Sequence, residues 1–199
     1  FPFAVIWDDH EVQNDYSDDR SQALDERGGF LARRAAAYQA YFEHMPLESS
    51  VQPHGPSLRI YGHTVLGDLA EIFMTDARQY RSAPPCYGPP DRRPGRVIRL
   101  NECAELHDSA RSMLGARQEA WLNNRLASSR ARWNIVGQSL LLAQMHRKND
   151  QGDAVLWTDD WNGYPEARTR LLRHLDAARV RNPVFLGGDH GIGSRSSEY

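Results

Sequence analysis

Short segments rich in β-branched and aromatic residues alternate with longer segments whose apolar residues recur every three or four positions. This alternation predicts an α/β fold with a largely buried sheet. With no internal repeat and no clear linker, a single domain is expected. Gly28 and Gly29 should break the chain before the first helix, and Gly62 should form a turn. The expected strands are 3–7, 58–61, 69–75, the start of 133–142, 154–157 and 184–186, and the expected helices are 30–45, 114–130 and 165–181.

Charge and composition exclude several classes of protein. The 24 Lys and Arg residues nearly balance the 26 Asp and Glu residues, giving a net charge of −2. A strongly basic nucleic-acid-binding protein is therefore excluded, and no nucleic-acid-binding surface is evident. No apolar run approaches the roughly 20 residues of a membrane-spanning helix. Cys86 and Cys103 lack CxxC spacing, which argues against a thiolate zinc site and leaves a single disulfide open.

Two polar clusters follow expected strands directly. The sequence WDDHEV at residues 7–12 places two carboxylates and an imidazole after the first strand, and GGDH at residues 187–190 places Asp and His after the last. Catalytic and ligand-binding groups of open α/β sheets lie at the carboxyl ends of strands. Asp and His bind divalent cations or act in acid–base catalysis. The alternative for each cluster is a polar turn of solvated side chains.

A third cluster places Asp76, Arg78 and Arg81 in a loop after another expected strand. Guanidinium groups make two-point contacts with phosphate oxygens, so this loop is a candidate phosphate-binding segment. A structural Asp–Arg ion pair explains the spacing equally well. The aromatic residues around Asp159 and Asp160 offer two readings, the lining of a pocket or a cluster that seals an edge of the sheet, and the second is the expectation. No Gly-x-Ser-x-Gly nucleophile turn and no phosphate-cradling glycine-rich loop occurs.

Taken together, these segments resemble the alkaline phosphatase D (PhoD-like) family of the metallophosphoesterase superfamily. Residues 7–12 with Asn14 resemble the family's WDDHEV-x-N motif, and GGDH approaches its G-D-I-H motif. Ala77 stands where the family's D-T-R-x-Y-R segment has Thr, and Asn162 replaces the Asp of its W-D-G-Y-P turn. The matching segments, in the family's order, are residues 7–14, 75–81, 114–122, 133–138, 161–165 and 187–190.

The resemblance implies a two-sheet sandwich flanked by helices, with a dinuclear metal centre at the strand ends. In this family the metals are typically iron with calcium, which bind a small-molecule phosphate ester and generate a hydroxide nucleophile. By motif matching, Asp9 and His190 would be metal ligands. His10 would stabilise or protonate the leaving oxygen, and Arg78 would contact the phosphate.

The chain also departs from the pattern of this family. Its upstream metal-ligand motif would precede Phe1, and the missing Ile before His190 would turn that side chain to the opposite face of an extended strand. We therefore expect a partial metallophosphoesterase domain at 1–190, incomplete at both ends, and a disordered or aberrant tail at 191–199. The predicted function is metal-dependent alkaline phosphatase or phosphodiesterase activity. The alternatives are an inactive fragment with at most an interaction role, and an unrelated α/β domain. The family is usually exported, which implies a periplasmic or extracellular protein.

Overall fold

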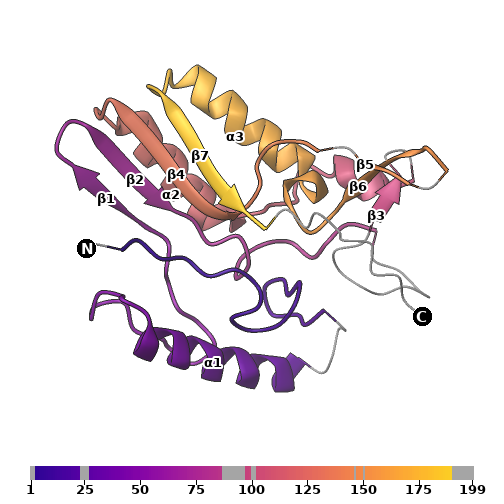
Figure 1. Cartoon of the computed structure of the whole chain (residues 1–199), viewed down its shortest axis with the longest axis horizontal. Coiled ribbons are helices and arrows are strands. Elements are labelled where there is room, and N and C mark those ends of the chain that lie inside the picture. The colour runs from indigo at the N-terminus through magenta and orange to yellow at the C-terminus, as the bar shows by residue number, and fades with distance from the viewer. Residues whose placement is uncertain are drawn as a thin grey trace.

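A mixed four-stranded sheet forms the centre of the computed structural model, which describes residues 3–22, 27–86, 97–99, 102–145, 147–149 and 151–189. Its strands lie in the order β1-β2-β4-β7 (Figure 1). Strands β2, β4 and β7 are parallel, while β1 pairs with β2 as an antiparallel hairpin. The carboxyl ends of the parallel strands therefore meet at one edge of the sheet. The bounds are β1 Gly62–Leu66, β2 Ala70–Met74, β4 Trp133–Leu140 and β7 Pro183–Gly188.

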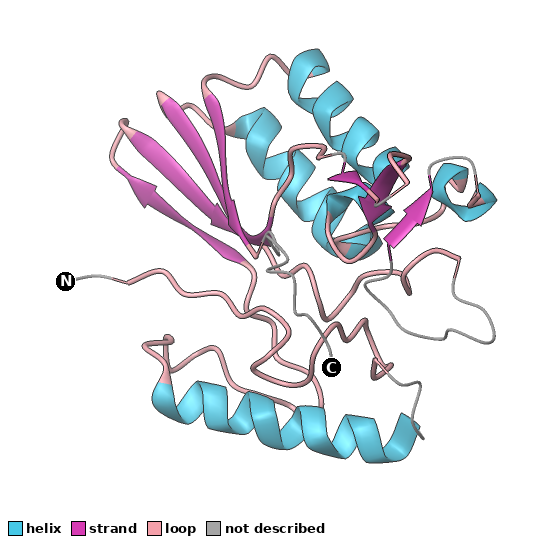
Figure 2. Cartoon of the chain, turned by 45° about the vertical axis from the view of Figure 1, so that its right-hand side comes forward, coloured by secondary structure: helices cyan, strands magenta, loops and turns pink. Residues whose placement is uncertain are grey.

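Helices α2 (Gly115–Ser128) and α3 (Pro165–Ala177) lie together on one face of this sheet (Figure 2). Each connects two neighbouring parallel strands, which is the usual β-α-β arrangement. Pro165 occupies the first turn of α3, where the missing backbone N–H costs nothing. The main core lies between these helices and the sheet and includes Phe73, Leu122, Val136, Trp161 and Leu171.

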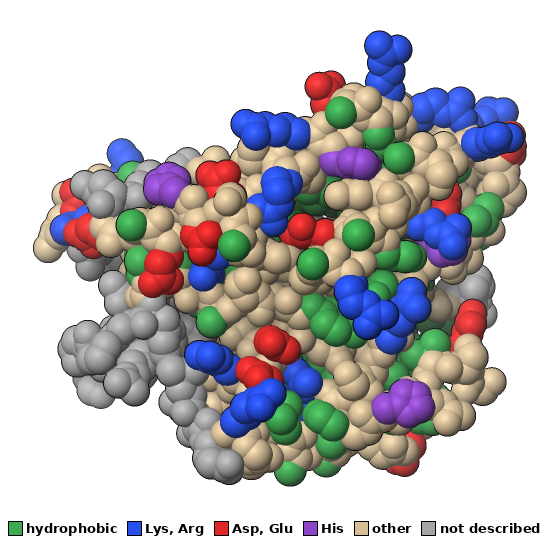
Figure 3. Space-filling model, turned by 180° about the vertical axis from the view of Figure 1, so that it is seen from behind, with side chains coloured by type: hydrophobic (Ala, Val, Ile, Leu, Met, Phe, Trp, Pro, Cys, Tyr) green, Lys and Arg blue, Asp and Glu red, His purple; other side chains and the backbone are tan. Residues whose placement is uncertain are grey.

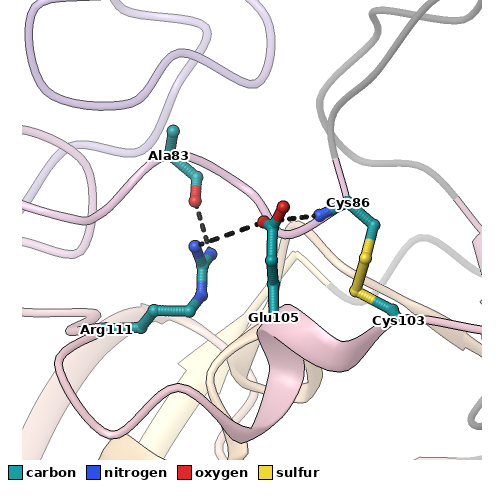
Figure 4. The surroundings of a disulfide bond; sticks show 5 residues. All are labelled: Ala83, Cys86, Cys103, Glu105 and Arg111. Atoms are coloured by element: carbon teal, nitrogen blue, oxygen red, sulfur yellow. Dashed lines mark hydrogen bonds and ion pairs between the residues drawn. A yellow bond between two sulfur atoms is a disulfide. The ribbon is translucent and has the colours of Figure 1, made fainter.

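A separate antiparallel sheet has the order β3-β6-β5, with β3 Val97–Arg99, β6 Ala154–Trp157 and β5 Arg147–Lys148. A disulfide between Cys86 and Cys103 lies beside it, next to the short 3-10 helix η1 (Ala104–His107). Glu105 and Arg111 connect this disulfide to the preceding loop, because Glu105 accepts from the Cys86 amide and Arg111 donates to the Ala83 carbonyl (Figure 4). The single disulfide that the sequence left open is therefore present in the structure.

Helix α1 (Arg27–His44) packs against the N-terminal segment (Figure 2). The indole of Trp7 is fully buried and stacks on Tyr38 with ring centroids 4.2 Å apart. Tyr41 meets the same indole edge-on, and Leu58 and Ile60 complete this second core. The contact fixes the position of the two aspartates that follow Trp7.

The structure confirms the α/β class with two sheets and flanking helices, and it corrects several local predictions. Residues 3–7 and 58–61 are not strands, because neither segment pairs with a strand among the described residues. Trp7 of the first segment and Leu58 and Ile60 of the second are buried in one cluster with Tyr38 and Tyr41 of α1 instead. Gly28 and Gly29 lie inside the first turn of α1, and Gly62 starts β1 rather than forming a turn. The hairpin turn contains Gly67, whose φ of +57° favours glycine.

The surface shows no concentration of one charge on the face drawn in Figure 3, where acidic and basic side chains are interspersed. This pattern agrees with the nearly balanced composition. Among the described residues, no helix combines the length and apolar character that crossing a membrane requires.

Candidate metal centre

Three strands deliver the candidate functional residues to one region. Strand β2 leads into the loop of residues 75–81, β7 is followed directly by Asp189, and β6 leads into residues 158–160. The N-terminal segment with Asp8 and Asp9 lies against them, since both aspartates contact Arg78 of the β2 loop. In Figure 1, β7 ends near the middle of the molecule, close to the path of the indigo N-terminal segment. The site therefore lies at the carboxyl ends of the strands, as in other open α/β sheets.

Carboxylate oxygens of Asp8, Asp9 and Asp189 lie within 4.8 Å of one another. Asp9 is buried and accepts a hydrogen bond from the Asp15 amide at 2.7 Å, whereas the side chain of Asp189 is 52% exposed. Burial and the neighbouring carboxylates of Asp8 and Asp9 raise the pKa of Asp189. A group of carboxylates that is anchored on one side and open to solvent on the other suits a hard divalent cation. The residues present thus fit a metal ion.

Arg78 is the cation nearest to this acidic cluster, and its side chain is fully buried. Its Nε lies 2.5 Å from Asp8 Oδ1, and its Nη1 lies 2.7 Å from Asp159 Oδ2. Its Nη2 is 3.7 Å from an Asp9 oxygen and 3.6 Å from an Asp189 oxygen. Four carboxylates surround one guanidinium, so the charge of Arg78 offsets part of their mutual repulsion.

Asp159 is buried between two arginines. Its Oδ1 lies 2.6 Å from Nη2 of Arg81, on the side opposite Arg78. Although burial opposes its charged form, Arg81 and Arg78 hold the pKa of Asp159 below its usual range. Arg81 also donates to the backbone carbonyls of Asp15 and Tyr16. This arginine therefore ties the N-terminal segment to the loop after β6.

The backbone of the β2 loop is fixed by Asp76, which has no exposed surface. Its carboxylate accepts from the amides of Arg78 and Gln79, both at 2.9 Å. Gln118 of α2 holds the Asp76 amide and carbonyl from the other side. An ion pair between Asp76 and an arginine of this loop was one expectation from the sequence. In the structure the Asp76 carboxylate instead accepts hydrogen bonds from backbone amides, and Arg78 and Arg81 form ion pairs with Asp159.

His10 lies at the solvent-exposed rim, with its Nε2 2.9 Å from Asn14 Oδ1 and 3.8 Å from Asp9 Oδ2. The hydrogen bond with Asn14 and the charge of Asp9 raise the pKa of His10 above 6.5. A raised pKa keeps more of the imidazole protonated near neutral pH, which suits a proton donor. Asp15, behind the cluster, has its pKa raised to about 7, first by burial and then by Asp159.

The structure brings three of the four predicted site residues together: Asp9, His10 and Arg78. His190 lies outside the described residues. Four further residues belong to this region: Asp8, Arg81 and Asp189, which lie in the polar clusters predicted from the sequence but were given no site role of their own, and Asp159. Asp8 and Asp189 sit inside the two motifs already singled out, so their signal was present. Asp159 was assigned to an aromatic edge, and only its distance from Arg78 reveals its role.

Comparisons with known proteins show to which proteins this chain is similar. A family model described as PhoD-like phosphatase matches residues 1–191. "Alkaline phosphatase D" of Bacillus subtilis (strain 168) is 37% identical over 189 residues, which cover 95% of this chain and 31% of that protein. A solved structure titled "Structure of PhoD" matches with a TM-score of 0.84 at 36% identity, covering 95% of this chain and 34% of the other. The chain thus spans about a third of the length of these relatives.

Proposed function

Since the chain belongs to the PhoD-like phosphatase family, we propose that it takes part in metal-dependent hydrolysis of small phosphate esters, as an alkaline phosphatase or phosphodiesterase. The observation that carries this proposal is the carboxylate group of Asp8, Asp9 and Asp189, with oxygens within 4.8 Å of one another. A cation held there would supply Lewis-acid stabilisation of the ester oxygens.

Asp9 is the first proposed ligand, because its carboxylate is held in place by the Asp15 amide and faces Asp189. Asp189 follows β7 directly and is reachable from solvent. His190 remains a proposed ligand from motif matching. A dinuclear centre of iron with calcium is proposed on the same basis, and the carboxylates suit the calcium.

His10 is proposed as the group that donates a proton to the leaving oxygen. It lies next to the acidic cluster, and its imidazole reaches solvent where an ester would enter. Asn14 orients the ring through Nε2. Arg78 was the candidate phosphate contact, but its full burial favours a role inside the protein.

An oxidising compartment is proposed for this protein, either the periplasm or the exterior of the cell. The support is the disulfide between Cys86 and Cys103, since disulfides are rare in the reducing cytosol. The resemblance to a family that is usually exported also supports a location outside the cytosol.

The test is hydrolysis of a chromogenic phosphodiester by the purified 199-residue chain with added iron and calcium. Asp9→Asn should lower kcat at least tenfold because it removes a proposed metal ligand. His10→Gln should also lower kcat at least tenfold, because general acid catalysis contributes about 10²–10⁴-fold. Asp176→Asn, an exposed charge change on α3, is the matched control. Turnover that both site variants leave intact would refute the assignment. No turnover by the wild-type chain would support the inactive-fragment alternative.

A further inference from the structure

Two buried arginines and one buried aspartate form a continuous row beside the carboxylate cluster. Arg81 Nη2 lies 2.6 Å from one oxygen of Asp159, and Arg78 Nη1 lies 2.7 Å from the other. Both guanidinium groups are fully buried, and Asp159 is 1% exposed. Screening by solvent is therefore weak, and each charge depends on the others for compensation.

The contacts of Arg78 with the four carboxylates are unequal. Nε of Arg78 donates a short charge-assisted hydrogen bond to Asp8. Nη1 forms a close ion pair with Asp159 at 2.7 Å that lacks hydrogen-bond geometry. The distances of 3.7 Å to Asp9 and 3.6 Å to Asp189 are too long for hydrogen bonds. Arg78 thus lends its charge to Asp9 and Asp189 without binding their oxygens.

We propose that Asp159 is a positioning residue for the metal centre: it holds Arg78 back from Asp9 and Asp189, so that these carboxylates stay available to a divalent cation. This inference rests on the proposed metal-dependent function. In this proposal Arg78 is an internal counter-ion for the surrounding carboxylates and not a phosphate ligand.

Position, not charge alone, is what Asp159 supplies. Among the described residues, Asp159 is the carboxylate that contacts Nη1 of Arg78. Without Asp159, Arg78 would close the remaining gap to Asp9 and Asp189 and compete with the cation. Arg81 prevents Asp159 from following, because it binds both the side chain and the backbone carbonyl of Asp159.

The first test measures the Mn²⁺ dissociation constant of the full chain by electron paramagnetic resonance of free Mn²⁺. Asp159→Asn should weaken binding at least tenfold. Asp159→Glu keeps the charge but moves the carboxylate by one methylene, and it should also weaken binding at least fivefold. The control Asp176→Asn should stay within twofold. Wild-type affinity in a folded Asp159→Glu protein would overturn the inference, because charge alone would then suffice.

The second test separates positioning from the simple loss of a negative charge. Asp159→Asn is repeated in an Arg78→Gln background, where no guanidinium is left to position. The inference expects the added loss of Mn²⁺ affinity to shrink to within threefold. An equal loss in both backgrounds would overturn it, since Asp159 would then act on the cation directly.

A crystal structure of metal-free Asp159→Asn decides the case in which the wild-type chain binds no Mn²⁺. That result would refute the proposed metal-dependent function of this chain and leave the position of Arg78 to be read directly. The inference expects an Arg78 nitrogen within hydrogen-bond distance of Asp9 or Asp189. An unmoved Arg78 would overturn it. Asp159→Glu serves in the same way should Asp159→Asn fail to fold.

Discussion

Gly163 is the residue at which a single added methyl group should cause the most local damage. It ends the short 3-10 helix η2 (Trp161–Gly163), which follows Asp159 and Asp160. An added Cβ would lie 2.1 Å from the carbonyl oxygen of Thr158 and 2.9 Å from its carbonyl carbon. These are backbone atoms, so no side chain can swing away to make room.

The cost of Gly163→Ala follows from the displacement that it requires. Ordinary contact begins at 3.4 Å, so the Thr158 carbonyl and residue 163 must separate by about 1.3 Å. That movement strains the turn bonds from Gly163 and Asn162 to Asp160. Overpacking a tight site costs about 1–3 kcal/mol, and a backbone clash belongs at the upper end. A loss of about 3 kcal/mol lowers Tm by roughly 6–12 °C in a chain of this size.

Thermal unfolding followed by circular dichroism measures this change against a matched control. Gly62→Ala makes the same chemical change in β1, where an added Cβ meets nothing within 4 Å. Its Tm should equal or slightly exceed that of the wild type, because Ala loses less backbone entropy than Gly on folding. Equal Tm values for Gly163→Ala and Gly62→Ala would refute the steric reasoning.

Three further predictions concern the disulfide and two titrating groups. Replacing Cys86 and Cys103 by Ser opens a loop with a sequence separation of 17 residues, and loop entropy predicts a loss of about 3 kcal/mol in the free energy of unfolding; urea denaturation checks it, and a loss below about 1 kcal/mol would contradict the entropic account. Asn14→Ala removes the main cause of the raised pKa of His10, so this imidazole should titrate at lower pH in an NMR titration, whereas an unchanged midpoint would mean that another group sets the pKa. Burial raises the pKa of Asp15 from 3.8 to about 7, so the folded state binds this proton more tightly than the unfolded state, and wild-type stability should fall as pH rises through that window. Asp15→Asn should flatten the decline in unfolding free energy between about pH 4 and pH 7, and parallel curves for the two proteins would count against the assignment.

Local sequence patterns predicted several of the elements between the first helix and the last strand, although the expected strand at 58–61 is wrong and β1 was not expected. Residues 154–157 match β6, and the expected helix at 165–181 contains α3, because their apolar spacing and Pro165 act within the element itself. The segment 3–7 failed for a different reason. Its composition is that of a buried strand, but strand formation needs a partner, and the side chain of Trp7 is buried by Tyr38 instead.

In the candidate site, too, some residues were predictable from local sequence and others depend on a partner far away in the chain. Motifs pointed to Asp9 and His10 because these residues follow an apolar segment directly, and the parallel arrangement of β2 and β7 then brings Arg78 and Asp189 to them. Asp159 carries no such signal, since it lies 81 positions after Arg78 in a turn that looks structural. A buried charge acquires its role from the opposite charge that folding places beside it. Residues of this kind are found by asking which carboxylate compensates each buried arginine, and here that question leads from Arg78 to Asp159.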